Sequence, residues 1–249
     1  MSKKPADRKN PLADAQRSER NRKIMIQVGV AAVLVGLVAA IGIGLAMRDS
    51  KDGSDFNPVV THDAAAGAVP PNVTEGGAIR IGKPDAKAKI QIVADLQCPA
   101  CKGFEQTNAS VLDDALSSGD ARIEYSIISF LDRASQGNQY STRAANAAYV
   151  VASADTTNFQ KWLELMFAKQ PAEGANGMTD DQLIAIAAEA GYTDPAVAQG
   201  IRDGKYIAYV KDATKAVFDT GLDSTPTVYV NGKKVNPQSL KSEIEAAAK

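Results

Sequence analysis

The stretch that decides the fold is "AKIQIVADLQCPACKGFE", residues 88–105. Its first part is apolar at Ile90 and Ile92, which predicts a strand that ends just before the cysteines. Its second part holds Cys98 and Cys101, the only two cysteines in 249 residues. Two thiols at this spacing form half of a metal site, a structural disulfide or a redox couple, and the sequence around them has to decide between these uses.

The segments around this stretch continue a strand–helix–strand pattern. Residues 78–82 and 121–130 are further strand candidates, and the second of them alternates apolar and polar side chains. Between them, residues 101–119 place apolar side chains at helical spacing and end in a glycine. This order is typical of an open α/β sheet.

The rest of the chain interrupts and then completes this α/β unit. Residues from about 132 to 219 are Ala-rich and amphipathic, which predicts an inserted group of helices. A strand then leads into Asn231-Gly232, a strong hairpin signal, and Asn236 is a candidate cap for a last helix. Residues 78–249 are therefore expected to form one α/β domain with a helical insertion.

The N-terminal part has a different character. Residues 1–23 carry eight basic and three acidic side chains, and residues 24–47 contain no charge. As a helix, 24 residues span ~36 Å, enough to cross a ~30 Å hydrocarbon core. We expect a basic cytoplasmic tail at 1–23, a single membrane anchor at 24–47 and a C-terminal domain outside the cell membrane. A cleaved signal peptide is the alternative, although its apolar region is usually shorter.

Residues 48–77 lack periodicity and are rich in Gly, Pro, Ala and Asp, so we expect a flexible linker. The one histidine, His62, lies in it and is expected to be solvated. The whole chain has 28 basic and 29 acidic side chains, and the part beyond the basic tail is net acidic. This balance gives no sign of a nucleic-acid-binding surface.

Of the three uses of the cysteines, the redox couple has the best physical support. A closed zinc site needs four ligands, and this chain offers two cysteines and one distant histidine, so no metal site is expected. A structural disulfide across two residues closes a very small loop and removes little entropy from the unfolded chain.

A redox couple fits the position of the thiols at the start of a helix. Cys98 is predicted to be the N-cap, with Pro99 at the first helical position, where a missing N–H is not needed. The free N–H groups of the first turn and the helix dipole then favour the Cys98 thiolate and lower its pKa. Cys101, one turn later, is expected to be buried and to remain a thiol that resolves the mixed disulfide.

A second feature supports this interpretation. In "STPTVYVNGK" (224–233), Pro226 directly precedes a strand, which suggests a cis Thr225–Pro226 bond with the backbone of Thr225 beside the sulfur, where an extended substrate can pair with it. Asp95 either shuttles a proton to Cys101 or caps and solvates the strand end. Lys102 and Glu105 are expected to be solvated residues of the first helical turns.

The motifs "AKIQIVADLQCPACKGFE", "NFQKWLELMFAKQ" and "FDTGLDSTPTVYVNGKKV", in this order, resemble the DsbA-like thioredoxin-fold proteins, specifically the membrane-anchored bacterial type. The resemblance runs from about Ile79 to the C-terminus. It implies a thioredoxin fold with an inserted helical domain, an active-site disulfide Cys98–Cys101 and a cis-proline at Pro226 facing it. It also implies extracytoplasmic thiol–disulfide exchange with folding exported proteins, and reoxidation by a quinone-linked membrane oxidase.

Two positions depart from the family pattern. Ala100 stands where the strongest oxidants have histidine, so we expect a less oxidising couple, and Ser224 replaces the usual glycine. No organic cofactor is expected, because the disulfide itself carries the electrons. We expect a protein dithiol oxidase; a disulfide reductase or isomerase, and a non-catalytic tethered peptide-binding module, are the alternatives. Substrates, redox partner and oligomeric state do not follow from the sequence.

Overall fold

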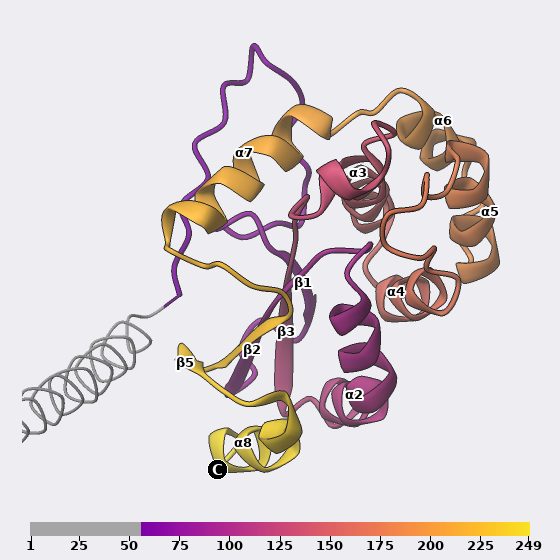
Figure 1. Cartoon of the computed structure of the whole chain (residues 1–249). Helices are drawn as coiled ribbons and strands as arrows, with labels where there is room; N and C mark the ends of the chain where they lie inside the picture. The colour runs from indigo at the N-terminus through magenta and orange to yellow at the C-terminus, as the bar shows by residue number, and fades with distance from the viewer. Residues whose placement is uncertain (1–55) are drawn as a thin grey trace, which may run out of the picture. The chain divides into compact units, whose positions relative to one another are not determined.

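A five-stranded mixed sheet carries the fold in the computed structural model, which describes residues 56–249 (Figure 1). The strand order is β1-β3-β2-β4-β5; β2 and β3 run parallel, and the other neighbours are antiparallel. The strands are β1 (Ile79–Gly82), β2 (Ala88–Ala94), β3 (Ala121–Ile127), β4 (Thr227–Val230) and β5 (Lys233–Lys234).

The central strand β2 positions the cysteines. Ile90 and Ile92 are almost completely buried, as the apolar pattern predicts for a strand with neighbours on both sides. The chain leaves β2 at Ala94, turns, and enters helix α2 (Pro99–Ser118), which returns it to the parallel strand β3. The predicted strand–helix–strand unit is confirmed, and Gly119 ends α2 in the left-handed conformation with a φ of 78°.

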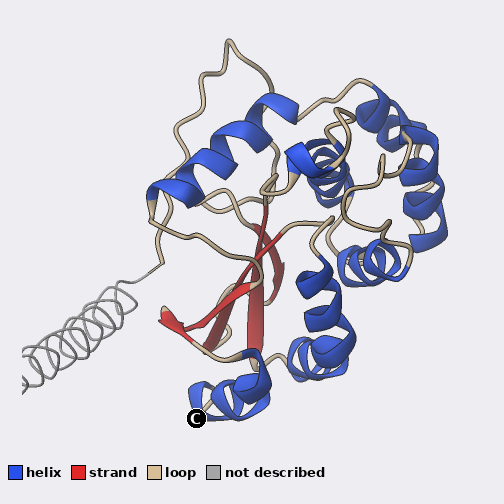
Figure 2. Ribbon diagram, in the orientation of Figure 1, coloured by secondary structure: helices blue, strands red, loops and turns tan. Residues whose placement is uncertain are grey.

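Helices cover both faces of the sheet. Helix α7 (Ile207–Asp219) lies on one side, and α2 and α8 (Leu240–Ala247) lie on the other (Figures 1 and 2). Since side chains alternate along a strand, β2 contributes apolar residues to both layers. The short hairpin after β4 has positive φ at Asn231 (48°) and Gly232 (84°), as predicted for this dipeptide.

The predicted helical insertion is confirmed between β3 and β4. Its helix α4 (Phe159–Ala168) packs beside α2, whereas its last helix, α7, lies on the other face of the sheet (Figure 1). Helix α5 begins with a reciprocal cap between Thr179 and Gln182. Trp162 is completely buried in this insertion. The insertion comprises η1 (Asp132–Ala134), α3 (Tyr140–Ala154), α4 (Phe159–Ala168), α5 (Asp180–Ala190), α6 (Pro195–Arg202) and α7, and a 3-10 turn η2 (Pro237–Ser239) precedes α8.

Residues 56–77, here called the strap, are the described part of the segment that was expected to be a flexible linker. They pack on the domain, so for this part the expectation is wrong. Phe56 is 5% exposed, and its ring stacks on Tyr229 of β4 with centroids 4.7 Å apart. The prediction that His62 is solvated is wrong: its side chain is 3% exposed, and Nδ1 lies 2.7 Å from the Asp212 carboxylate on α7. The strap packs because the sheet face beside α7 offers apolar surface that a ring can cover.

The predicted basic tail at 1–23 and membrane anchor at 24–47 lie outside the described residues. Within 56–249, no helix has both the length and the apolar character needed to cross a membrane.

Candidate active site

The two cysteines lie at the N-terminus of α2, as the sequence predicts. Cys98 is the N-cap residue, with φ −75° and ψ 120°, and Pro99 occupies the start of the helix. The backbone oxygen of Cys98 accepts the first helical hydrogen bond, from the Lys102 N–H at 3.2 Å. Both thiols are free; Cys98 is 7% exposed and Cys101 only 1%. The outer sulfur is therefore the one that a substrate can reach.

The environment of Cys98 lowers its thiol pKa to about 5. The largest cause is a hydrogen bond from the Cys101 thiol, and partial burial opposes it. The Thr225 side chain and the backbone N–H groups of Cys101 and Ala100 lower the pKa further. The predicted effect of the first-turn N–H groups is thus present, and the larger contribution of the second thiol is a finding of the structure.

The environment of Cys101 acts in the opposite direction. Burial raises the pKa of its thiol far above the ordinary value, and the adjacent negative charge of Cys98 raises it further. One thiol of the pair is therefore ionised at neutral pH while the other keeps its proton. This division is what an exchanging nucleophile and a resolving thiol require.

The loop before β4 faces the Cys98 sulfur. The Thr225–Pro226 peptide bond is cis, as predicted. The Cys98 sulfur lies 3.5 Å from the backbone oxygen of Thr225, a residue 127 positions further along the chain. Sheet pairing of β4 with β2 brings the two segments together, because Thr227 lies opposite Val93 at the end of β2.

Asp95 joins the end of β2 to the helical insertion. Its carboxylate is completely buried and accepts hydrogen bonds from the Gln97 and Leu131 N–H groups, both at 2.7 Å, and from the Ser141 hydroxyl at 2.8 Å. Burial raises its pKa to about 6, although these hydrogen bonds lower it. The negative charge of Cys98 raises the pKa further. The carboxylate caps the strand end but is not solvated, and proton transfer to Cys101 stays a prediction.

Sequence reasoning missed the polar residues that hold this turn. Gln97 donates to the Ala134 oxygen at 3.0 Å and accepts from Ser141 at 3.2 Å. Gln170, just after α4, donates to the Leu96 and Cys98 oxygens. No local signal marks these side chains, since their partners lie 37 to 74 residues away in sequence.

The prediction that Glu105 is solvated is wrong. It lies four residues after Cys101, so it shares the inward face of α2, and it is 3% exposed. Its carboxylate accepts a hydrogen bond from Gln160 at 2.8 Å, and the Gln160 oxygen accepts one from the Tyr125 hydroxyl at 2.9 Å. Burial raises the Glu105 pKa to about 8, and the charges of two nearby carboxylates raise it further. Lys102 is half-buried and donates toward the end of α4.

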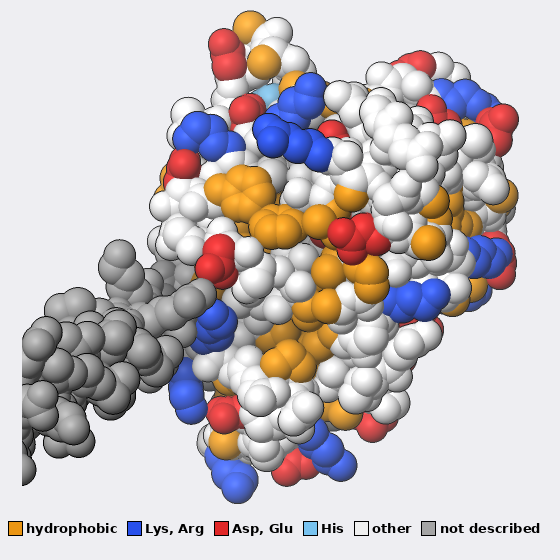
Figure 3. All heavy atoms as spheres, viewed as in Figure 1, with side chains coloured by type: hydrophobic (Ala, Val, Ile, Leu, Met, Phe, Trp, Pro, Cys, Tyr) orange, Lys and Arg blue, Asp and Glu red, His pale blue; other side chains and the backbone are white. Residues whose placement is uncertain are grey.

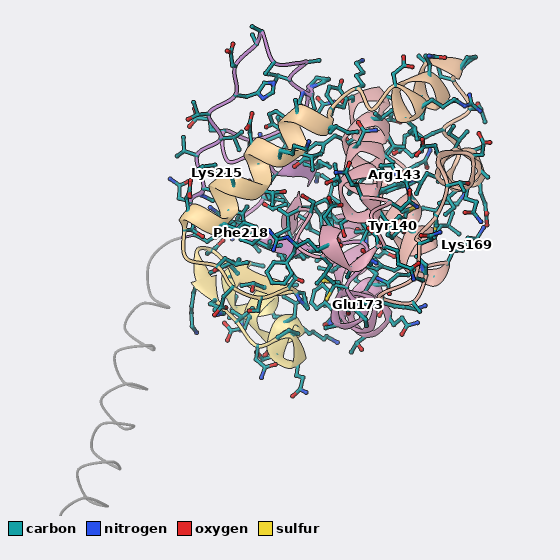
Figure 4. The ribbon with its side chains drawn as sticks, turned by 45° about the horizontal axis from the view of Figure 1, so that its top comes forward. Tyr140, Arg143, Lys169, Glu173, Lys215 and Phe218 are labelled. Carbon is teal, nitrogen blue, oxygen red and sulfur yellow. The ribbon has the colours of Figure 1, made fainter. Side chains whose placement is uncertain are left out.

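An apolar surface lies near the cis-proline loop. Hydrophobic side chains form a band across the face drawn in Figure 3. Phe218 at the end of α7, labelled in Figure 4, is 39% exposed, and its ring lies 5.7 Å from that of Phe130. Phe130 and Leu222 are partly buried against the small core cluster that contains Phe56 and Tyr229. In residues 56–249, no group of three or more His, Cys, Asp or Glu side chains is placed to hold a metal ion.

Comparison with known families gives this geometry a context. The family model described as "Thioredoxin" matches residues 74–247, which is more than half of the chain. The chain belongs to the thioredoxin family.

Solved members of the thioredoxin family place the chain among the DsbA-like proteins. The oxidised DsbA of Mycobacterium tuberculosis is 31% identical, with a TM-score of 0.60, over 69% of this chain and 92% of that one. The reduced disulfide bond oxidoreductase DsbG of the same organism is 30% identical, also with a TM-score of 0.60, over 70% and 89%. The predicted thioredoxin fold and DsbA-like relationship are confirmed.

A relative of a different kind is the serine/threonine-protein kinase PknE of Mycobacterium tuberculosis. It is 29% identical over 166 residues, which are 64% of this chain. The chain spans only 29% of that kinase's length, so the match concerns one part of it.

Proposed function

We propose that the chain is an extracytoplasmic protein thiol–disulfide oxidoreductase that introduces disulfides into exported proteins through Cys98 and Cys101. The observation that carries the proposal is the unequal state of the two thiols at the start of α2. Cys98 has a pKa of about 5 and remains partly accessible, whereas Cys101 is buried and burial raises its pKa. The family relationship to DsbA-like proteins supports the same chemistry.

The low pKa of Cys98 favours the oxidising direction. A thiolate that the protein stabilises makes the reduced pair more stable, and a more stable reduced pair is a stronger oxidant. Ala100 supplies a backbone N–H but no cationic side chain, so the couple is expected to be less oxidising than one with histidine at this position. An Ala100→His variant is expected to become more oxidising in equilibrium with glutathione; an unchanged equilibrium constant refutes this role of position 100.

The exchange has two balanced steps. A substrate thiolate attacks the Cys98 sulfur of the disulfide, the Cys98–Cys101 bond breaks, and Cys101 leaves and takes up a proton. A second substrate thiolate then attacks the substrate sulfur of the mixed disulfide, and Cys98 leaves as a stabilised thiolate. The substrate loses two electrons and the enzyme gains them, so the cysteine pair must be reoxidised. We assign that task to a quinone-linked membrane oxidase.

Substrate binding follows from the same surface. The backbone of Thr225 lies beside the Cys98 sulfur, where an extended peptide can add hydrogen bonds next to the exchanging atom. The apolar surface around Phe218 and Phe130 is suited to unfolded chains, which expose apolar side chains. A membrane anchor at 24–47 would hold the domain where exported chains emerge.

The test is oxidation of a reduced, unfolded protein with several cysteines. The full-length chain in its disulfide form is expected to oxidise it, and Cys98→Ser is expected to abolish the reaction. Cys101→Ser has no disulfide of its own, so it is first treated with oxidised glutathione, which joins glutathione to Cys98 and releases reduced glutathione. A substrate thiolate then displaces the glutathione, and mixed disulfides between Cys98 and the substrate are expected to accumulate, because Cys101 is not there to release them. If the wild-type chain does not oxidise the substrate, the proposal fails.

Two alternative functions remain distinguishable. Thr225 before the cis-proline also suits a reductase or isomerase, and a measured equilibrium constant with glutathione decides the direction. A non-catalytic peptide-binding module would bind peptides beside Pro226 without exchange. In that case Cys98→Ser and Cys101→Ser would leave every cellular phenotype intact.

A further inference from the structure

The side-chain amide of Gln170 connects the helical insertion to the turn that carries Cys98. Its Nε2 atom donates to the backbone oxygens of Leu96 and Cys98, at 3.0 Å in each case. An amide NH₂ group has two hydrogens, so both are used here. Cys98 is the N-cap of α2 and Leu96 lies two residues before it, so one side chain fixes the turn at both ends.

Gln170 itself is held firmly. Its N–H donates to the Phe167 oxygen at the end of α4, at 3.2 Å. Pro171 follows it and restricts its backbone to extended conformations. Lys169 and Glu173, which bracket this segment in the sequence, are labelled in Figure 4. The carboxamide is therefore presented to the Cys98 turn by a fixed backbone.

The two oxygens that Gln170 binds have few other donors. The Cys98 oxygen also accepts from the Lys102 N–H within α2. Leu96 is 1% exposed, so its oxygen has little access to water. A buried carbonyl without a donor is costly, and the backbone would rotate to find one. Such a rotation at Leu96–Cys98 would move the sulfur relative to the first-turn N–H groups of α2.

We propose that Gln170 is a positioning residue for thiol–disulfide exchange, which holds the Cys98 sulfur in line with the first turn of α2 and thereby stabilises the reduced form of the pair. The proposal rests on the function proposed above, because it concerns the redox equilibrium of the same two cysteines. It gives the helical insertion a direct role in that equilibrium.

The test compares two substitutions in the full-length chain. Gln170→Met keeps the length and neutrality of the side chain and removes both donors. Gln136→Met is the matched control: the Gln136 amide donates to the Gly174 oxygen at 2.8 Å, so it binds the same loop without contacting the Cys98 turn. Each variant is equilibrated with reduced and oxidised glutathione, and the Cys98 thiolate is titrated by its ultraviolet absorbance.

Gln170→Met is expected to shift the glutathione equilibrium constant about three- to tenfold toward the disulfide form. The Cys98 oxygen keeps the Lys102 N–H as a donor, so the net loss is close to that of one hydrogen bond, at the Leu96 oxygen. The titration midpoint of Cys98 is expected to rise by about half to one pH unit, and Gln136→Met is expected to change neither value. The inference is overturned if Gln170→Met matches the wild type in both measurements, or if Gln136→Met shifts them equally. If the wild-type chain does not equilibrate with glutathione at all, the proposed function fails first, so the two failures are separable.

Discussion

Replacement of the buried Glu105 by glutamine is expected to change how stability depends on pH. The carboxyl group lies in the interface between α2 and α4, where burial raises its pKa from 4.5 to about 8. Between these two values the folded protein holds a proton that the unfolded chain releases. The corresponding stability is fully present below pH 4.5 and is lost as the pH rises through 8.

The size of the effect follows from the shift. Each pH unit in this window costs about 1.4 kcal/mol of unfolding free energy, so the wild type loses about 3 kcal/mol from this group between pH 5 and pH 7. The new amide side chain of a Glu105→Gln variant stays neutral and still offers an oxygen to Gln160. The stability difference between variant and wild type is therefore expected to grow from a little under about 1 kcal/mol at pH 5 to about 3 kcal/mol at pH 7 in favour of the variant.

The assay is urea unfolding at pH 5, 6 and 7, followed by the fluorescence of Trp162, the only tryptophan in the chain. Trp162 lies on α4, whose Gln160 donates to Glu105. Glu245→Gln on the exposed side of α8 is the control, and it is expected to change stability by less than about 0.5 kcal/mol at every pH. Parallel stability curves for Glu105→Gln and the wild type would refute the reasoning.

Three further outcomes test the active site. The alkylation rate of the reduced protein is expected to reach half its maximum near pH 5, against about 8.5 for a free cysteine, and a midpoint above 8 would contradict the ionised state of Cys98. Asp95→Asn is expected to remove an inflection near pH 6 from the pH profile of the reaction with glutathione; a retained inflection would exclude proton transfer by Asp95. Phe218→Ser is expected to lower kcat/KM about tenfold for a reduced unfolded protein while leaving the reaction with glutathione unchanged, since glutathione is too small to need the apolar surface. Equal losses with both substrates would assign Phe218 a structural role.

The parts of the fold that depend on local chemistry could be predicted from the sequence. The N-cap position of Cys98 follows from a strand, a turn and Pro99, which are neighbours in the chain. The hairpin at Asn231-Gly232 and the cap at Asn236 follow from backbone and side-chain preferences of one or two residues. Each of these features is determined within about five residues, so no knowledge of the tertiary structure is needed.

The features that depend on distant partners could not be predicted. Glu105 looks like a solvated helix residue until α4 covers it with Gln160, 55 positions away. The strap looks like a linker, because nothing in its composition indicates that Phe56 has a ring to stack on or that His62 has a carboxylate to bind. Burial of this kind is a property of the packed elements and not of the segment itself.

The active site combines features that local sequence determines with contacts from the helical insertion. The sequence Cys98-Pro99-Ala100-Cys101 places a sulfur at the N-terminus of a helix, but many helices have a polar atom at that position. What differs here is the turn before the helix, where Asp95 is held by groups of the insertion and the carbonyls of Leu96 and Cys98 are held by Gln170. Because the free energy of a thiolate depends on the dipoles that face it, a change in these contacts alters the redox equilibrium without changing either cysteine. Proteins with the same four active-site residues and different insertions are therefore expected to differ in oxidising strength.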